Sequence, residues 1–258
     1  MWAKGTDNLE AYLLCLQSKE QLNCWSKDAL FRARQLAENA IALDPNYAEA
    51  YCMLAWSYWF EVPLFLTKDP GQSIARAMEL GKKAIALDKS LGYAHSLMGY
   101  MYILKRQYDE SIAECEQAVS LEPSSARAHY FLGVVLQYAG KHKEAISMTK
   151  EAIRLEPIPP SHYYDNLAAS YCSTGQYEEA TIAGNKAVQI QPDSLVARAF
   201  LAAAYSLSGR KEEARVEAEE VLRINSKFSV DRWTEKMPYK NEEDKELIIT
   251  ALRNAGLK

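Results

Sequence analysis

Cysteine, excess charge and long apolar runs are all scarce in this chain of 258 residues. Its five cysteines are odd in number and no two lie closer than nine positions, which excludes a CxxC redox or zinc motif. We therefore expect reduced, buried thiols in a cytoplasmic setting. The 30 basic residues are interspersed with 34 acidic ones, for a net charge of −4, so no nucleic-acid partner is expected. The cysteines are Cys15, Cys24, Cys52, Cys115 and Cys172.

No stretch is apolar enough to suggest a membrane span. The most apolar window, residues 50–66, contains Glu61 and Pro63 and falls short of the required length. A basic-then-apolar leader is also missing from the start of the chain. With 48% apolar and 25% charged residues, the composition is that of a globular protein without membrane insertion.

Catalytic motifs are missing as well. The sequence contains no GxxxxGK, GxGxxG, HExxH or GxSxG. One SxxK match, residues 147–150, has no partner motif and is attributed to chance. His95 and His129 lie 34 residues apart without a third metal ligand, and no nucleophile accompanies His142 or His162. We expect a non-catalytic chain with no metal and no cofactor.

What the chain does contain is a repeat. Segments such as AIALDP, AVSLEP and AVQIQP recur, and successive copies end 44, 34, 34, 35 and 34 residues apart. Gly140, Gly175 and Gly209 recur at intervals of 35 and 34 residues. A period near 34 with two helical stretches in each unit predicts stacked helix pairs, each covering the apolar face of the next. The closing residues of the copies are Pro45, Lys89, Pro123, Pro157, Pro192 and Ser226.

Small and apolar residues recur at fixed places in each unit. In residues 126–159 they include Leu132, Gly133, Ala145 and Ala152, followed by the closing proline. This pattern resembles the tetratricopeptide repeat. The resemblance implies an all-α fold, a right-handed α-solenoid of stacked antiparallel helix pairs with a concave groove. We add a C-terminal capping helix, predicted from Asn241 as N-cap, an apolar stripe and Gly256 as terminator.

The expected organisation has three parts. Residues 1–6 are a linker remnant, 7–228 the solenoid and 229–258 the C-terminal capping segment. In the third repeat Arg106 replaces the turn glycine, which predicts a strained or differently shaped connection. An inserted apolar loop, residues 61–73, either folds back on neighbouring helices or forms a recognition loop; the first is favoured. The repeats are 7–47, 48–91 with that loop, 92–125, 126–160, 161–194 and 195–228.

The candidate binding site is the groove. At 100° per residue, positions 2, 5, 9 and 12 of each first helix point away from the packing positions. The resemblance implies that these residues line the inside of the superhelix. Exposed Trp and Tyr there would anchor a peptide or helix, whereas packing on the loop or tail would leave little free surface. The groove residues are Cys52, Trp56, Trp59, Tyr93, Ser96, Tyr100, Arg127, Tyr130, Val134, Tyr138, His162 and Asp165.

The family's carboxylate-clamp subclass, which holds chaperone C-termini, is disfavoured. It needs Lys and Asn at groove positions 2, 5 and 9. Here Cys52, Ser96, Tyr130 and Asp165 occupy position 5, and no position 9 holds Asn. The partner is therefore a protein or peptide of another class.

The whole chain also resembles the C-terminal repeat region of bacterial class III adenylate/guanylate cyclase-type signalling proteins. The ending MPYKNEEDKELIITALRNAGLK is the most specific part of this likeness. It implies an excised regulatory region that follows a catalytic domain in the parent polypeptide. Two functions stay open: a partner-docking module, or an oligomerisation scaffold that brings attached catalytic domains together by self-association. An enzyme in its own right is disfavoured by the missing motifs.

Overall fold

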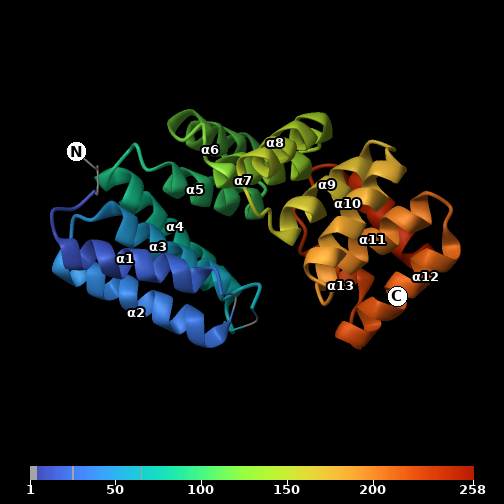
Figure 1. Ribbon diagram of the computed structural model, residues 1–258, viewed down its shortest axis with the longest axis horizontal. Helices are drawn as coiled ribbons and strands as arrows, with labels where there is room; N and C mark the ends of the chain where they lie inside the picture. The colour runs from blue at the N-terminus through green and yellow to red at the C-terminus, as the bar shows by residue number, and fades with distance from the viewer. Residues whose placement is uncertain (1–4, 25, 65) are drawn as a thin grey trace. The chain divides into compact units, whose positions relative to one another are not determined.

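The computed structural model describes residues 5–24, 26–64 and 66–258, so most of the expected linker remnant and Phe65 lie outside the described residues. Within these ranges the chain forms fourteen α-helices and no strand (Figure 1). The helices are α1 (Leu9–Leu22), α2 (Lys27–Leu43), α3 (Ala48–Phe60), α4 (Pro70–Leu87), α5 (Gly92–Leu104), α6 (Tyr108–Leu121), α7 (Ala126–Tyr138), α8 (His142–Leu155), α9 (Ser161–Ser173), α10 (Tyr177–Ile190), α11 (Leu195–Leu207), α12 (Lys211–Ile224), α13 (Val230–Glu235) and α14 (Glu242–Asn254).

The helices are arranged in consecutive pairs. In Figure 1, α1 lies along α2, α7 along α8 and α11 along α12, and each of these pairs is in contact. The predicted all-helical, paired fold is therefore confirmed. The chain divides into two compact units, one of residues 1–101 with 113–122, the other of residues 102–112 with 123–258.

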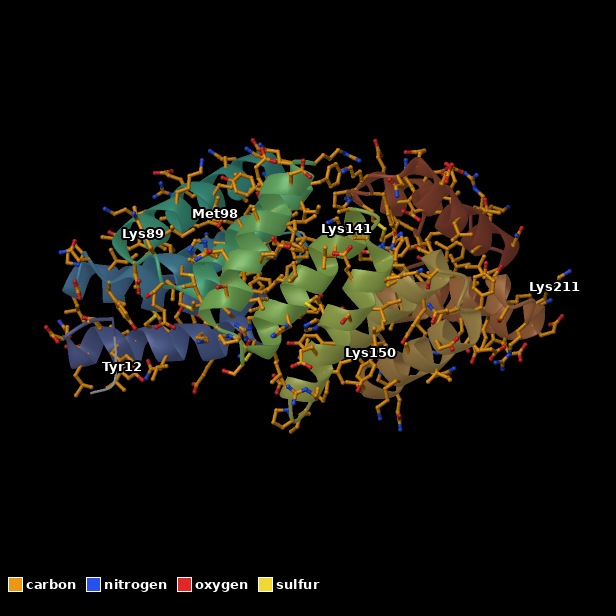
Figure 2. The ribbon with its side chains drawn as sticks, turned by 90° about the horizontal axis from the view of Figure 1, so that it is seen from above. Tyr12, Lys89, Met98, Lys141, Lys150 and Lys211 are labelled. Atoms are coloured by element: carbon orange, nitrogen blue, oxygen red, sulfur yellow. The ribbon has the colours of Figure 1, made fainter. Side chains whose placement is uncertain are left out.

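Small residues let the helices of a pair approach closely. Ala145 is fully buried where α8 crosses α7. Opposite it, a Cβ on residue 133 would run into the hydroxyl of Thr149 and the backbone of α8, so only glycine fits there. Successive pairs are equally close: Met98, labelled in Figure 2, would have its sulfur 2.9 Å from a Cβ on residue 81. The recurring small residues are thus required by packing.

The turns inside the pairs adopt a left-handed backbone conformation. Gly140, Gly175 and Gly209 have φ of +80°, +73° and +78°. Arg106 occupies the same place in the third repeat with φ of +58°. A side chain in this region costs about 1 kcal/mol or more relative to glycine. The predicted strained connection is therefore present. The side chain of Arg106 bonds the carbonyl of Tyr239 in the C-terminal tail, which accounts for an arginine at this place.

A side chain on the first helix of four repeats binds the carbonyl that closes the preceding repeat. These hydrogen bonds are Tyr51 Oη to Pro45 O (3.1 Å), His95 Nε2 to Lys89 O (3.1 Å), His129 Nε2 to Pro123 O (3.0 Å) and Arg198 Nε to Pro192 O (3.0 Å). The two histidines, 34 residues apart, thus have equivalent packing roles in adjacent repeats. They tie one repeat to the next.

The inserted loop in the second repeat is shorter than predicted. Its last four residues, 70–73, form the first turn of α4, so the prediction of a loop through residue 73 is wrong at that end. The helix extends because Asp69 accepts a hydrogen bond from the backbone N–H of Gln72 (3.0 Å) and Pro70 suits the first helical position.

The remaining loop is held against its own unit. Glu61 forms an ion pair with Arg34 (2.9 Å) and accepts a hydrogen bond from the hydroxyl of Ser73 (2.8 Å). Val62 and Leu64 are partly buried, whereas Leu66 is 38% exposed. These contacts favour the folded-back interpretation over a free recognition loop.

The C-terminal segment packs on the first helices of the last repeats. The predicted final helix is α14, which contacts α9, α11 and α13; its dark red ribbon lies next to α9 and α11 in Figure 1. Ile248 and Leu252 are fully buried there. Asn241 does precede the helix, but its side chain bonds the carboxylate of Asp244 (3.1 Å) instead of capping the backbone. The segment thus covers the face that carries the groove positions of α9 and α11.

Candidate functional site: the first-helix faces

In the first unit, the predicted groove aromatics pack against each other between α3 and α5. Trp56 stacks on Tyr93 with ring centroids 5.0 Å apart, and Trp59 meets Tyr100 edge-on at 5.0 Å. Trp56 is 1% exposed and Trp59 9%, while both tyrosines are partly exposed. Cys52 and Ser96 are buried as well and offer no surface to a partner. The tyrosines are therefore the part of this set that a partner could touch.

A lysine covers part of that surface. Lys19 of α1 places its ammonium group 5.6 Å from the centroid of the Tyr93 ring and 3.6 Å from the carboxylate of Glu49. An ammonium over a ring face is attracted by the quadrupole of the ring. A partner that binds Tyr93 must displace this lysine or offer a cation of its own.

In the second unit, a smaller aromatic cluster joins α7 and α9. Tyr130 stacks on Tyr163 at 4.6 Å and meets the His162 ring edge-on at 4.8 Å. Burial, with a smaller contribution from Arg127, lowers the pKa of His162 to about 4, so the imidazole is neutral at physiological pH. The cluster is an aromatic surface with one positive charge at its edge.

Asp165 is the unusual group of this face. It is 6% exposed, and its Oδ1 has no hydrogen-bond partner within the part of the chain that the structure describes. Burial raises the pKa of the carboxyl to about 7, so at neutral pH it is partly protonated and can donate a hydrogen bond as well as accept one. Val134 is buried beneath this face, so it supports the face but is not accessible to a partner.

Tyr138, the last predicted groove residue, binds the chain's own tail. The ring of Tyr239 lies edge-on to that of Tyr138 at 5.2 Å, and the N–H of Lys240 donates to the Tyr138 carbonyl (2.9 Å). The carbonyl of Tyr239 accepts from Arg106 Nη1 (2.8 Å) and from Tyr108 Oη (3.1 Å). Residues 237–244, called the strap below, are therefore held through both backbone and side chain.

The strap ends on two further contacts. His142 Nε2, at the start of α8, lies 2.9 Å from Asp244 Oδ2 at the start of α14. The side chain of Asn241 lies so close to Gly140 that a Cβ atom added to residue 140 would collide with the Asn241 amide. Sequence reasoning missed Arg106, Tyr108 and Tyr239 as a site, although the arginine at a glycine position was the available signal.

The first helix α1 exposes an apolar stripe. Ser18 marks the point where α1 crosses α2, because its Oγ donates to the carbonyl of Ala33 (2.7 Å), just as Gly133 lies opposite Ala145 where α7 crosses α8. Leu13 and Leu16 are the residues five and two places before this crossing point. They are 48% and 38% exposed, and Leu9 is 59% exposed. The corresponding residues of α3, α5 and α11 are buried: Ala50 and Met53, Ala94 and Leu97, Ala197 and Phe200. On α7 the corresponding Phe131 is only partly buried. Within the described residues, no preceding helix pair covers the stripe on α1 as one covers these positions of α3, α5 and α11.

Other kinds of site find little support among the described residues. Four of the five cysteines are buried and Cys24 is exposed, against the expectation that all are buried. Burial raises the pKa of Cys15 and of Cys172 to about 12, which keeps both thiols protonated. Within the described ranges, no cluster of three His, Cys, Asp or Glu has metal-site geometry. No helix there is both long and apolar enough to cross a bilayer.

Comparison with known proteins identifies the repeat. Two models of the tetratricopeptide repeat match, one at residues 93–125 and 126–159, the other at residues 162–191. No protein with curated function matches the chain in sequence.

Solved structures share the fold at low identity. Cut9–Hcn1 of the APC/C matches with a TM-score of 0.66 at 16% identity over 94% of this chain, which spans only 46% of that chain. A thermophilic tetratricopeptide repeat protein of Thermus thermophilus gives 0.58 at 21%, covering 74% of this chain and 98% of its own. YrrB, described as having an unusual peptide-binding site, gives 0.50 at 20%, covering 74% and 93%. The chain therefore contains tetratricopeptide repeats at residues 93–125, 126–159 and 162–191, within a paired-helix fold shared with proteins built from them.

Proposed function

We propose that the chain is a non-catalytic protein–protein interaction module that binds peptides or helices on its first-helix faces. The observation that carries this proposal is the tail: the face of α7 and α9 already binds a polypeptide segment through ring packing and backbone hydrogen bonds. YrrB, a tetratricopeptide repeat protein that shares the fold, has a peptide-binding site of its own. Such modules use exposed aromatics as anchors.

Each unit contributes its own binding surface to the proposal. In the first, Tyr93 and Tyr100 are the contact residues, and Cys52, Trp56, Trp59 and Ser96 support them from below. In the second, the contact residues are Arg127, Tyr130, Tyr138 and His162, with Asp165 as a buried hydrogen-bonding group and Val134 as support. We retain the proposed division into linker, six repeats and C-terminal segment, because a helix pair falls within each proposed repeat.

The test is a selection from a peptide library followed by calorimetry on the selected peptides. Tyr93→Ala/Tyr130→Ala should weaken binding at least tenfold, because stacking surface is lost on both faces. Phe31→Ala is the matched control, since Phe31 is an aromatic residue 73% exposed on α2, outside the proposed surfaces. Equal affinities for the double variant and the parent would refute the aromatic surfaces.

The parent protein is the finer part of the proposal. We propose that this region serves a bacterial, cytoplasmic nucleotide cyclase-type signalling protein as its regulatory or scaffolding C-terminal part. The support is the likeness of the ending from Met237 onward to such regions. An antibody raised against this chain should precipitate cyclase activity from cells that produce the parent. Precipitation of the parent polypeptide without cyclase activity would contradict the assignment.

Self-association is the second candidate function, and the stripe on α1 favours it. An open stacking face bearing Leu9, Leu13 and Leu16 could be covered by another copy of the chain. Sedimentation equilibrium should then detect a dimer that Leu13→Glu/Leu16→Glu converts to monomer. A parent chain that stays monomeric over a roughly 100-fold range of concentration would argue against the scaffold.

A further inference from the structure

We infer that the surface beneath the strap, which shares Tyr138 with the proposed binding face, recognises extended peptides that carry a Pro-aromatic pair followed, five residues after the aromatic, by a carboxylate. It is built from the turn between α5 and α6, the end of α7 and the start of α8, and the strap is its ligand within the chain. The inference rests on the proposed function only in treating the chain as a peptide-binding module. The occupant that we assign is a partner peptide of this chemistry.

The site binds the peptide backbone. Two donors from one repeat, Arg106 and Tyr108, meet the carbonyl of Tyr239 at 2.8 and 3.1 Å. An acceptor from the next repeat, the carbonyl of Tyr138, takes the following N–H at 2.9 Å. Donors and acceptor that converge on adjacent backbone groups hold any extended segment in register. Side-chain pockets then add specificity.

The aromatic pocket is closed and has a polar lining. Pro238 and Tyr239 are buried, and Tyr239 is 2% exposed. The Tyr239 hydroxyl lies beside the side chain of Gln137. Gln137 is itself only 2% exposed. A peptide aromatic that reaches this amide would therefore fit the pocket.

Arg106 keeps a strained backbone at this site. The same turn position in three later repeats is glycine, and the arginine accepts φ of +58° instead. Its guanidinium makes a hydrogen bond to the strap and another contact, at 3.5 Å, to Tyr108. Strain that persists beside a ligand contact is typical of binding sites. A turn with only a structural role would be served better by glycine.

The carboxylate requirement comes from His142. Its Nε2 lies 2.9 Å from Asp244, and both side chains are mostly buried, at 9% and 14% exposure. His142 stands at the first position of α8, five residues after Gln137 in the chain. The separation between the aromatic pocket and this histidine therefore fixes where a partner's acid must stand.

The strap, which includes the first three residues of α14, can leave without the rest of that helix. Residues 236–241 are non-helical and connect α13 to α14, and α14 has its own buried anchors on α9 and α11. A tethered ligand competes at an effective concentration of about millimolar, so it needs little intrinsic affinity to occupy the site. A free peptide with better contacts can compete with it.

The experiment uses the full chain and a labelled peptide of residues 234–244. Tyr239→Ala in the chain should vacate the site, so that the variant binds the peptide at least tenfold more tightly than the parent, measured by NMR titration up to several millimolar. Adding Arg106→Gly to that variant should weaken binding at least tenfold, and a peptide with Tyr239→Ala should not bind. No binding to a folded Tyr239→Ala chain, or equal binding after Arg106→Gly, would overturn the inference.

A second measurement covers the case in which Tyr239→Ala loses helical content. In the parent chain the Lys240 amide should exchange with solvent at least tenfold faster than the amides in the centre of α14, and faster still in Arg106→Gly. If the Lys240 amide and the amides in the centre of α14 all exchange only through global unfolding, the strap does not detach and the inference fails. A library peptide that binds the parent regardless of Arg106 would leave the proposed function standing while this inference fails.

Discussion

Asp165 shows how one buried side chain gives this protein a pH-dependent stability. Its folded-state pKa of about 7 lies above the ordinary 3.8, because burial penalises the charged form. The folded chain therefore binds this proton more tightly than the unfolded chain does. The contribution of Asp165 to stability is complete below about pH 4 and is lost as the pH rises through 7.

We predict that Asp165→Asn removes this dependence. The stability of the variant relative to the parent should rise by roughly 4 kcal/mol between pH 4 and pH 8. Urea denaturation at a series of pH values measures it. The comparison must be with the parent, because His162, with its lowered pKa, contributes the opposite slope between about 4 and 6.5. A pH-independent difference would mean that Asp165 is solvated.

His95 should respond to pH in a higher range. Its hydrogen bond to Glu114, assisted by that to the Lys89 carbonyl, raises its pKa above the ordinary 6.5 despite burial. The stability from this pair is therefore fully present below pH 6.5 and is lost as the pH rises through the raised pKa. Glu114→Gln should flatten the stability profile above pH 6.5, measured by urea denaturation. An unchanged slope in Glu114→Gln would contradict this role.

At the scale of the helix, capping distinguishes two N-termini that look alike in sequence. Asp69 before α4 accepts a backbone hydrogen bond from Gln72, whereas Asn241 before α14 bonds Asp244 instead. Both are good capping residues by type. Only the structure distinguishes the two N-termini, because the side chain of Asn241 donates to the carboxylate of Asp244 and lies close to Gly140.

The two caps should therefore respond differently to substitution. Asp69→Ala should cost about 1 kcal/mol, because it leaves a helix N–H without its acceptor. Asn241→Ala should cost clearly less, since no cap bond is lost. Thermal unfolding followed by circular dichroism compares the two. Equal losses would show that Asn241 caps α14 in solution.

At the scale of the whole molecule, the contribution of an apolar side chain to the free energy of unfolding depends on whether a neighbouring helix pair covers it. Leu16 and Leu97 occupy equivalent places on α1 and α5, yet Leu16 is 38% exposed and Leu97 fully buried. Leu97→Ala should cost about 2–5 kcal/mol in urea denaturation, because it opens a cavity in the core. Leu16→Ala should cost less than about 0.5 kcal/mol in dilute solution. A large loss at Leu16 would indicate that something already covers α1.

The repeat architecture could be predicted from the amino-acid sequence without coordinates. The 34-residue spacing, the small residues at the crossings and the turn glycines are local requirements of helix pairing, so they are written at fixed positions. The strained turn at Arg106 followed from the same logic, since any other residue at a glycine position must accept a positive φ.

The accessibility of the groove residues, in contrast, depends on packing between distant parts of the chain. Periodicity places Trp56, Ser96 and Tyr130 on one helix face, but it cannot say whether a ring packs on its neighbour or on a partner. Nor could it foresee that Tyr239 lies against Tyr138 and Arg106, far away in the chain. The tail carries no repeat pattern, so its position depends on long-range contacts that leave no periodic signal in the sequence.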